Sequence, residues 1–358
     1  MKKGTSHLLK RAEHFKTILT AEGFLVGIVA GLVVLLYRVL LEYAGRGMNL
    51  VLEYARKYPA LLGGWFLALF VLACIVGKLV KFEPMISGSG IPQVEGEMMG
   101  KLDQVWWKVL PAKFLGGFLS LFSGLSLGRE GPSIQIGAMA GKAVSKALKR
   151  EKTEERYLLT CGASAGLAAA FHAPLAGVLF SLEEIHKNFS VSVLVSVMTA
   201  SITADYISGE FLGFTSVFQF DIGQEVAPRY YWHIVILGVL LGVMGAFYNK
   251  MTIWVQGLYF KAKGLNETTR LLIPFLLAGV LGLLLPEVLG SGHGLIDMAA
   301  RGNMVLQSLA VLFAVKFLFS LICFGSGAPG GIFFPLLVLG ALLGGMYSTF
   351  AVKYMGLE

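Results

Sequence analysis

The chain contains 358 residues, of which 56% are hydrophobic and only 15% are charged, and it carries a formal net charge of +8. A soluble domain of this length would hold more charged residues, and the 45 glycines exceed ordinary usage. Membrane orientation explains the excess of Lys and Arg better than nucleic-acid binding does. The three cysteines stand in apolar stretches without a CxxC or Cys/His cluster, so metal or redox chemistry has little support.

Apolar segments long enough to cross a bilayer as helices recur along the whole chain. A membrane-spanning helix needs about 20 predominantly apolar residues. Segments of this kind lie at 22–44, 61–80, 106–124, 190–208, 230–256, 271–289, 304–324 and 331–350. The sequence therefore predicts an all-α polytopic membrane protein.

The distribution of basic residues predicts how the chain is oriented. The segment 1–21 is polar and basic, whereas the loop around 209–228 contains acidic residues and no Lys or Arg. Because basic segments next to a span stay in the cytoplasm, we expect 1–21 to be cytoplasmic and the protein to lie in a cell (inner or plasma) membrane. The exceptions to this pattern are Arg46, Arg56 and Lys57, which the predicted orientation places outside the cytoplasm.

Two sequence patterns recur at almost the same offset. Gly88-Ser89-Gly90 returns 202 positions later as Gly290-Ser291-Gly292. Pro132, with the Gly137, Ala138 and Gly141 that follow it, returns 203 positions later as Pro335, Gly340, Ala341 and Gly344. We therefore expect two transmembrane repeats, 22–208 and 230–358, joined by an extracytoplasmic linker at 209–229.

The two repeats are expected to have opposite orientations, because the second begins on the other side of the membrane. Inverted repeats are the plan of secondary transporters, which bind their substrates near the membrane midplane at broken helices. The first repeat continues through a hairpin at 158–184, whose counterpart would lie beyond Glu358. We therefore expect the second repeat to be incomplete at its C-terminal end.

Three glycine-rich segments interrupt otherwise apolar sequence. They comprise Gly88, Ser89, Gly90, Ile91 and Pro92; Gly128, Arg129, Glu130, Gly131 and Pro132; and Gly325 to Pro335, which ends in Gly331, Ile332, Phe333, Phe334 and Pro335. Irregular backbone at membrane depth is tolerated only where it lines a cavity or is buried in protein. A helix-compatible run follows each segment, so the free N–H groups of several helix starts can form an anion site.

Glu130 stands out because an ionisable residue at membrane depth generally marks an ion or proton pathway. Pro132 suits the first turn of a helix, which places Glu130 at a helix N-terminus where negative charge is favoured. Ionised, its carboxylate can occupy the anion site, and protonation releases it. Glu184, at the end of the 158–184 hairpin on the expected cytoplasmic side, is a candidate for receiving protons there.

Several long motifs in one order resemble the CLC family of chloride channels and proton/chloride antiporters. They are GSGIP at 88–92, GREGP at 128–132, the stretch 163–184 and GSGAPGGIFFP at 325–335. The resemblance implies a fold of inverted repeats with broken and re-entrant helices, and a homodimer in which each subunit has its own pore. It also implies proton transfer and gating by Glu130 and Glu184, and chloride binding by Ser89 and the backbone amides of Ile332 and Phe333.

The chain departs from the family pattern in two respects. Phe334 stands where alanine is common in the family, which affects the wall of the implied site. The family's remaining C-terminal helices have no counterpart here, nor does a tyrosine whose hydroxyl contributes to the central anion site. Tyr347 and Tyr354 fall in the wrong segment to replace that tyrosine.

The preferred interpretation is antiport of chloride and protons across a lipid bilayer, because family members with a glutamate at the position of Glu184 are typically antiporters. The alternatives are a passive chloride channel of the same architecture and a fragment of an antiporter that does not function alone. An intramembrane enzyme using Glu130 and Glu184 as acid and base lacks a nucleophile, a metal cluster or a cofactor motif. A cation transporter is disfavoured because the glycine-rich helix starts offer donors rather than oxygen ligands.

Overall fold

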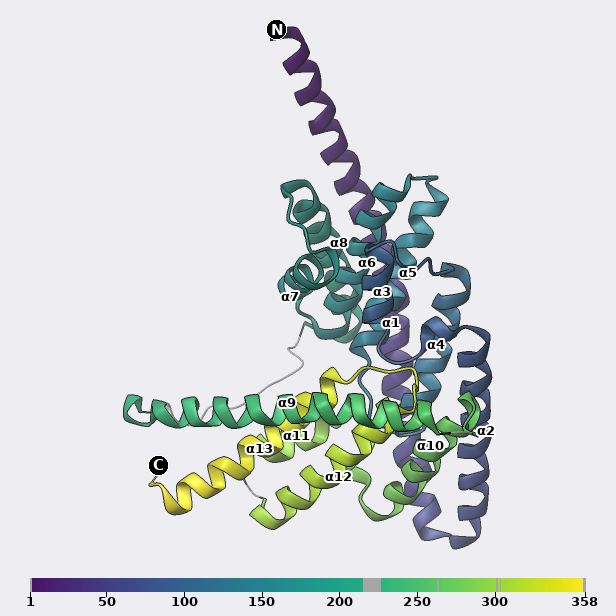
Figure 1. Cartoon of the computed structure of the whole chain (residues 1–358), viewed down its shortest axis with the longest axis vertical. Coiled ribbons are helices and arrows are strands. Elements are labelled where there is room, and N and C mark those ends of the chain that lie inside the picture. Colours follow the sequence, from purple (N-terminus) through teal and green to yellow (C-terminus); the bar gives the residue numbers. More distant parts are fainter. Residues whose placement is uncertain (1, 215–226, 263, 301, 303, 357–358) are drawn as a thin grey trace. The chain divides into compact units, whose positions relative to one another are not determined.

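A computed structural model describes residues 2–214, 227–262, 264–300, 302 and 304–356 (Figure 1). Within these ranges the regular structure is helical. The α-helices are α1 Lys2–Lys57, α2 Leu62–Phe82, α3 Ile91–Met98, α4 Trp106–Phe122, α5 Glu130–Ala147, α6 Lys152–Phe171, α7 Pro174–Phe180, α8 Val191–Leu212, α9 Tyr231–Lys261, α10 Glu267–Leu284, α11 His293–Ala300, α12 Leu306–Gly325 and α13 Phe333–Tyr354. Short turns accompany them, including the 3-10 turns η2 Pro84–Ile86 and η5 Pro286–Val288 and the π turn η3 Ser181–His186.

Seven helical stretches of the described residues are long and apolar enough to cross a membrane, which confirms the all-α polytopic prediction. The eighth predicted span, 106–124, is the 17-residue helix α4. The first span lies within a helix far longer than the predicted 22–44, because no proline or cap ends α1 before Lys57. The predicted span 271–289 is wrong at its end: α10 stops at Leu284 because Pro286 begins a 3-10 turn.

The chain forms two compact units. Unit 1 comprises 1–42, 89–115 and 130–217, and unit 2 comprises 43–88, 116–129 and 218–358. These units are not the two predicted repeats, because 43–88 and 116–129 belong to the first repeat in sequence and group with the second in space. The repeat boundaries stay a prediction, and residues 215–226 of the predicted linker lie outside the described residues.

Unit 1 is built around the packing of α5 against α6. Gly137 of α5 meets Gly162 of α6 so closely that a Cβ on Gly137 would lie 2.2 Å from the Gly162 carbonyl oxygen. Gly141 and Gly166 face the partner helix in the same way. A Cβ on Gly141 would lie 2.2 Å from the Leu158 carbonyl oxygen, and one on Gly166 would lie 2.3 Å from the Ser133 carbonyl oxygen. Small residues let membrane helices approach until their backbones touch, and this interface relies on that property.

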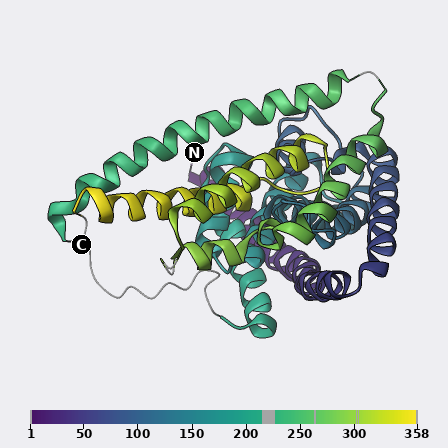
Figure 2. The same cartoon turned by 90° about the horizontal axis from the view of Figure 1, so that it is seen from below.

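Unit 2 contains two helix groups. In one, α2 packs on α10, where Gly77 leaves room for Thr268. In the other, α12 lies beside α9 and α13 (Figure 2). Tyr248 of α9 is buried against Phe317 of α12, and its hydroxyl donates to the Ser320 Oγ at 3.1 Å.

The order of elements repeats along the chain. The series α2, η2, α3, α4 and α5 returns as α10, η5, α11, α12 and α13. The backbone repeats as well, because Gly88 and Gly90 have φ values of 66° and 93°, and the corresponding Gly290 and Gly292 have 59° and 91°. The sequence offset of 202 to 203 positions therefore reflects two copies of one structural motif, the first copy ending in α5 and the second in α13.

Replacing Gly137 with alanine should destabilise the protein by roughly 1–3 kcal/mol, because the added methyl meets a backbone carbonyl that cannot move aside. The matched control is Gly242→Ala in α9, where a Cβ would meet nothing within 4 Å. Thermal unfolding of the purified protein in detergent measures both. Equal melting temperatures for the two variants would contradict close packing of α5 on α6.

Candidate functional site

Backbone hydrogen bonds within unit 2 join parts of all three glycine-rich segments. Gly128 and Gly331 form an antiparallel bridge, with N···O distances of 2.7 Å and 2.8 Å in the two directions. The Gly330 N–H donates to the Gly88 carbonyl at 2.9 Å, and the Gly88 N–H donates to the Gly327 carbonyl at 3.4 Å. The non-helical backbone that precedes α5 and α13 is thereby satisfied within the protein, as it must be at membrane depth.

In unit 1, the turn at Ser89 lies against the start of α5. A Cβ on Gly131 would be 2.7 Å from the Ser89 carbonyl oxygen, so only glycine fits at this approach. The Ser89 Oγ accepts a hydrogen bond from the Ile91 N–H at 3.3 Å, which leaves its hydroxyl hydrogen available as a donor. Gly90, the residue before α3, adopts the left-handed conformation.

Each glycine-rich segment leads directly into a helix. Glu130 is the first residue of α5 and is 2% exposed. Ile332 is the N-cap of α13, and Phe333 is its first residue. The first N–H groups of a helix have no acceptor within that helix, and the anion site at these helix starts stays a prediction.

Comparison with known proteins decides the family. Residues 68–357 match the model of the voltage gated chloride channel family. A structure of a slow cyanobacterial Cl−/H+ antiporter superposes with a TM-score of 0.88 at 30% identity, over 95% of this chain and 81% of that one. The chain belongs to the CLC family.

Two further structures share the fold. A CLC-type fluoride/proton antiporter matches with a TM-score of 0.77 at 20% identity, covering 96% of this chain and 82% of that one. A eukaryotic CLC transporter matches with a TM-score of 0.76 at 23% identity, covering 94% of this chain and 61% of that one. The chain is therefore a multi-pass membrane protein with the CLC arrangement of helices.

The second copy of the CLC motif differs from the first at the helix start. Phe334 occupies the position that corresponds to Gly131, and its side chain is fully buried. Its ring stacks on His293, the first residue of α11, with ring centroids 3.8 Å apart and planes 16° apart. An aromatic pair therefore packs in the second copy where the first copy has a close approach of two backbones.

Glu184 lies in the π turn η3 and is solvent-exposed. Lys187, which follows the turn in a left-handed conformation, forms an ion pair with Glu95 of α3 and interacts electrostatically with Glu184. His186 of the same turn lies 3.1 Å from the Thr160 Oγ1, and burial lowers the pKa of its imidazole. The predicted proton-transfer residue is thus surrounded by charged and titratable groups.

Two buried lysines at equivalent positions of the two copies were not predicted from the sequence. Lys113 of α4 and Lys316 of α12 are both fully buried. The Lys316 Nζ donates to the carbonyls of Val288 and Gly290, at 2.9 and 2.8 Å, which fixes the turn before α11. The sequence does contain a signal for this pair of lysines, because Lys113 and Lys316 are separated by the same 203 positions as the two proline motifs.

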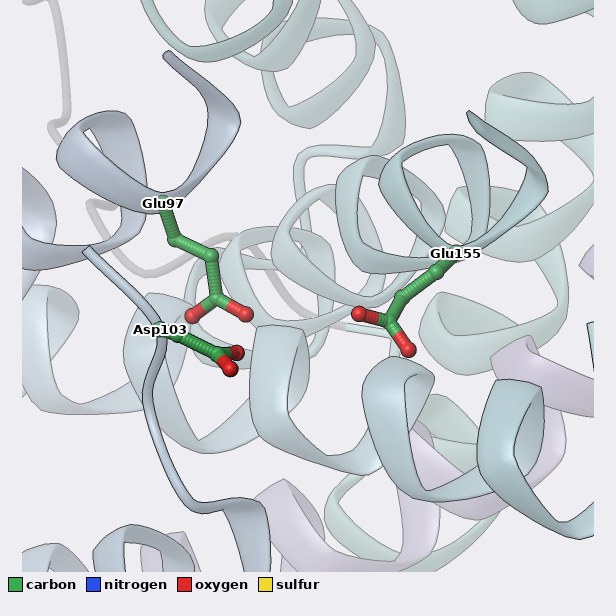
Figure 3. Close-up of side chains that lie close together, drawn as sticks. All are labelled: Glu97, Asp103 and Glu155. Atoms are coloured by element: carbon green, nitrogen blue, oxygen red, sulfur yellow. The ribbon is translucent and has the colours of Figure 1, made fainter. Parts of the chain in front are cut away.

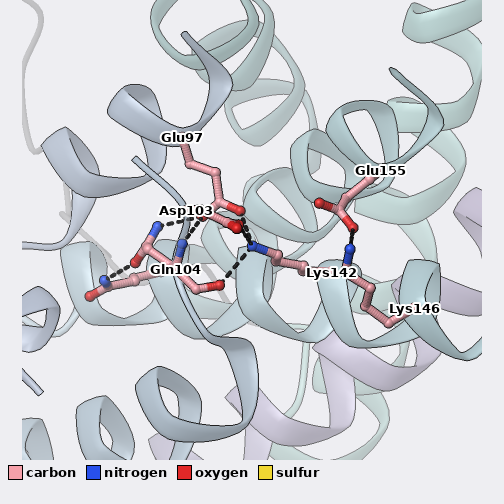
Figure 4. Close-up of polar contacts among 7 residues, drawn as sticks. Glu97, Asp103, Gln104, Lys142, Lys146 and Glu155 are labelled. Atoms are coloured by element: carbon pink, nitrogen blue, oxygen red, sulfur yellow. Dashed lines mark hydrogen bonds and ion pairs between the residues drawn. The ribbon is translucent and has the colours of Figure 1, made fainter. Parts of the chain in front are cut away.

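A largely buried polar network was also not predicted from the sequence. The carboxylates of Glu97, Asp103 and Glu155 lie within 4.8 Å of one another (Figure 3), which is a spacing compatible with metal binding. The ammonium group of Lys142 bonds to two of the three, Glu97 and Asp103 (Figure 4). Lys146 bonds to the third at 2.6 Å. Each of the three carboxylates is thus paired with a lysine.

In the sequence Lys142 opens the basic run 142–152, which the distribution of Lys and Arg predicts to be cytoplasmic. The structure places it inside α5 with only 2% of its surface exposed. Its partners, Glu97 and Asp103, precede it by about forty residues. Sequence spacing cannot reveal such a pairing, because it depends on how α3 packs against α5.

Asp103 yields a pH-dependent prediction. Its hydrogen bond to the Lys142 ammonium lowers the pKa of Asp103 below the ordinary value of about 3.9. The stability from this pair is therefore present above that ordinary pKa and is lost as the pH falls through the lower folded-state pKa. We expect Asp103→Asn to lower the melting temperature slightly at pH 7, and by less at pH 3.

The expected loss is small, because Asp103 is largely exposed and solvent screens the pair to below about 1 kcal/mol. Melting temperatures in detergent at the two pH values measure it. Asp297→Asn, at an exposed position of α11, serves as the control and should show no such pH-dependent difference. A deficit of equal size at both pH values would contradict the pairing.

Proposed function

We propose that this CLC protein exchanges chloride for protons across the membrane. The observation that carries the proposal is the position of Glu130, a buried carboxylate at the first residue of α5 within the GREGP motif. The cyanobacterial relative at 30% identity is described as a Cl−/H+ antiporter, which supports the same activity here.

Chloride binds, in this proposal, to the Ser89 hydroxyl and to the backbone amides of Ile332 and Phe333. Ser89 has a hydroxyl hydrogen to donate, and the two amides belong to the start of α13. Helix N-termini favour anions through their free N–H groups and the helix dipole. Such donors bind an anion without a full positive charge, so that it can also be released, as conduction requires.

Glu130 acts as the gate through competition between its carboxylate and chloride. In its ionised form the side chain takes the place of the anion at the helix start, because both are attracted by the same donors. Protonation removes this attraction, and the side chain leaves the site to chloride. Because proton and anion exclude each other, their fluxes are coupled.

Glu184 relays protons between the cytoplasmic solution and Glu130. Its exposed position in η3 suits exchange with bulk water. The neighbouring Lys187 interacts electrostatically with the Glu184 carboxylate.

The family and the charge distribution support a proposal for the membrane, the orientation and the oligomeric state of the transporter. We propose that it lies in the cell membrane with the segment 1–21 in the cytoplasm. We also propose that it is a homodimer in which each subunit transports independently, with chloride and protons as its substrates.

The proposal is tested in liposomes under an imposed chloride gradient, with chloride and proton fluxes recorded together. The wild-type protein should drive protons uphill. Glu130→Gln should reduce proton flux to background while chloride still moves, because the amide cannot carry a proton through the cycle. Glu184→Gln should likewise abolish proton movement and retain chloride movement.

The matched control is Glu183→Gln, which changes the exposed neighbour of Glu184 and should leave both fluxes unchanged. Chloride flux without proton movement in the wild-type protein would identify a passive channel instead. Proton coupling that survives Glu130→Gln would refute the gating role.

A further inference from the structure

The polar network around Lys142 links α3 to α5, the two helices that begin at the Ser89 turn and at Glu130. Its buried ion pair joins Lys142 to Glu97, at the end of α3 farther from Ser89. Lys142 also donates to the Asp103 carboxylate at 2.7 Å and to the Gln104 carbonyl at 2.6 Å (Figure 4). An ion pair of this kind is costly to bury and is weak evidence for stability, so another role has to be considered.

The network continues from the ion pair toward the Ser89 turn. The Gln104 Nε2 donates to the Glu97 Oε2 at 3.0 Å, and the Gln135 Nε2 donates to the Gln104 Oε1 at 2.7 Å. The Gln135 Oε1 then faces Gly90, where a Cβ would lie only 2.3 Å away. Hydrogen-bonded side chains therefore run from the exposed Asp103 to the turn that holds Ser89.

The charges fix the direction of every hydrogen bond in this network. An ammonium group can only donate, and an ionised carboxylate can only accept. Glu97 therefore requires the NH2 end of Gln104, and the carbonyl end of Gln104 requires the NH2 end of Gln135. The carbonyl oxygen of Gln135, rather than its NH2 group, is thereby turned toward Gly90.

The second copy provides an internal comparison, because α11 packs on α13 as α3 packs on α5. Val338 corresponds to Gln135 and takes the same place against Gly292, at 2.9 Å from a Cβ built there. Glu97 and Lys142 correspond to Ala299 and Gly345, which also face each other, with 3.8 Å between the Ala299 Cβ and a Cβ built on Gly345. These contacts between α11 and α13 are apolar, and the turn before α11 is held by the buried Lys316 of α12.

We infer that Lys142, Glu97 and Gln135 are positioning residues for the chloride site of the first copy. The ion pair orients the Gln135 amide against Gly90, and Gln135 in turn holds the Ser89 turn at the start of α5. The polar network occurs in the copy that carries Ser89 and Glu130, whereas apolar residues replace it in the other copy. This inference rests on the proposed function of Ser89 in binding chloride.

The test measures chloride affinity by isothermal titration calorimetry of the full chain in detergent. Lys142→Met should weaken chloride binding about tenfold, because the amide orientation is lost and Ser89 is held less firmly. Gln135→Met should give a similar loss while leaving the ion pair in place. Lys142→Arg, which retains a donor charge, should bind chloride within about twofold of the wild-type protein.

The matched control is Arg150→Met. This variant removes a basic residue from Glu22, a carboxylate as buried as Glu97, in an ion pair of unit 1 that does not involve α3. It should lower the melting temperature and leave chloride affinity unchanged. Equal losses of affinity in Arg150→Met and Lys142→Met would overturn the inference, as would wild-type affinity in both Lys142→Met and Gln135→Met.

Hydrogen exchange of the segment 89–98 separates this inference from the proposed function. Lys142→Met and Gln135→Met should speed amide exchange in this segment, and Arg150→Met should not. A wild-type protein that binds no chloride would refute the proposed function, and the exchange measurement would still decide whether the network holds the Ser89 turn. Unchanged exchange in both variants would overturn the positioning role.

Discussion

The structure depends on satisfying backbone N–H and C=O groups where the chain leaves the helical conformation at membrane depth. An unpaired group of this kind costs several kcal/mol in an apolar environment. Unit 2 meets the requirement by pairing non-helical segments with one another, through the bridge between Gly128 and Gly331 and the bonds between Gly88 and Gly327–Gly330. These backbone bonds keep the carbonyls and N–H groups of the non-helical segments paired within the protein.

The second constraint is that some backbone segments must approach each other closely, and glycine permits this approach in two places. Between α5 and α6, glycines on both helices remove the side chains that would separate them. At the Ser89 turn, Gly131 allows the start of α5 to lie against a backbone carbonyl. The same lack of a side chain thus serves helix packing in one place and the geometry of the candidate anion site in another.

The two copies of the motif share a backbone and differ in chemistry. Gly131, Gln135 and Lys142 of the first copy correspond to Phe334, Val338 and Gly345 of the second. The first copy therefore has a polar helix start supported by a hydrogen-bonded network, and the second has an aromatic stack and apolar contacts. Duplication preserved the packing of the helices, while Glu97, Glu130 and Lys142 of the first copy correspond to Ala299, Phe333 and Gly345 of the second.

The candidate site illustrates what local sequence can and cannot reveal. Glu130 at the first residue of α5 and the helix starts at Ile91 and Phe333 followed from glycine and proline, whose backbone preferences act within a few residues. The ion pair between Glu97 and Lys142 did not, since forty-five positions separate its members. The stacking of Phe334 on His293 likewise could not be predicted from the sequence, because it depends on the packing of α11 on α13.

The sequence by itself determined that the protein is helical and membrane-spanning, that a motif recurs after 202 to 203 positions, and where the helix starts lie. These features follow from composition, periodicity and local conformational preference. All three can be read from the sequence without knowing which residues meet in the folded chain. Only the tertiary structure decided which buried charges neutralise each other and which glycines permit backbone contact. Those outcomes depend on side chains from helices far apart in the chain meeting in three dimensions, where the low dielectric makes an unpaired charge costly.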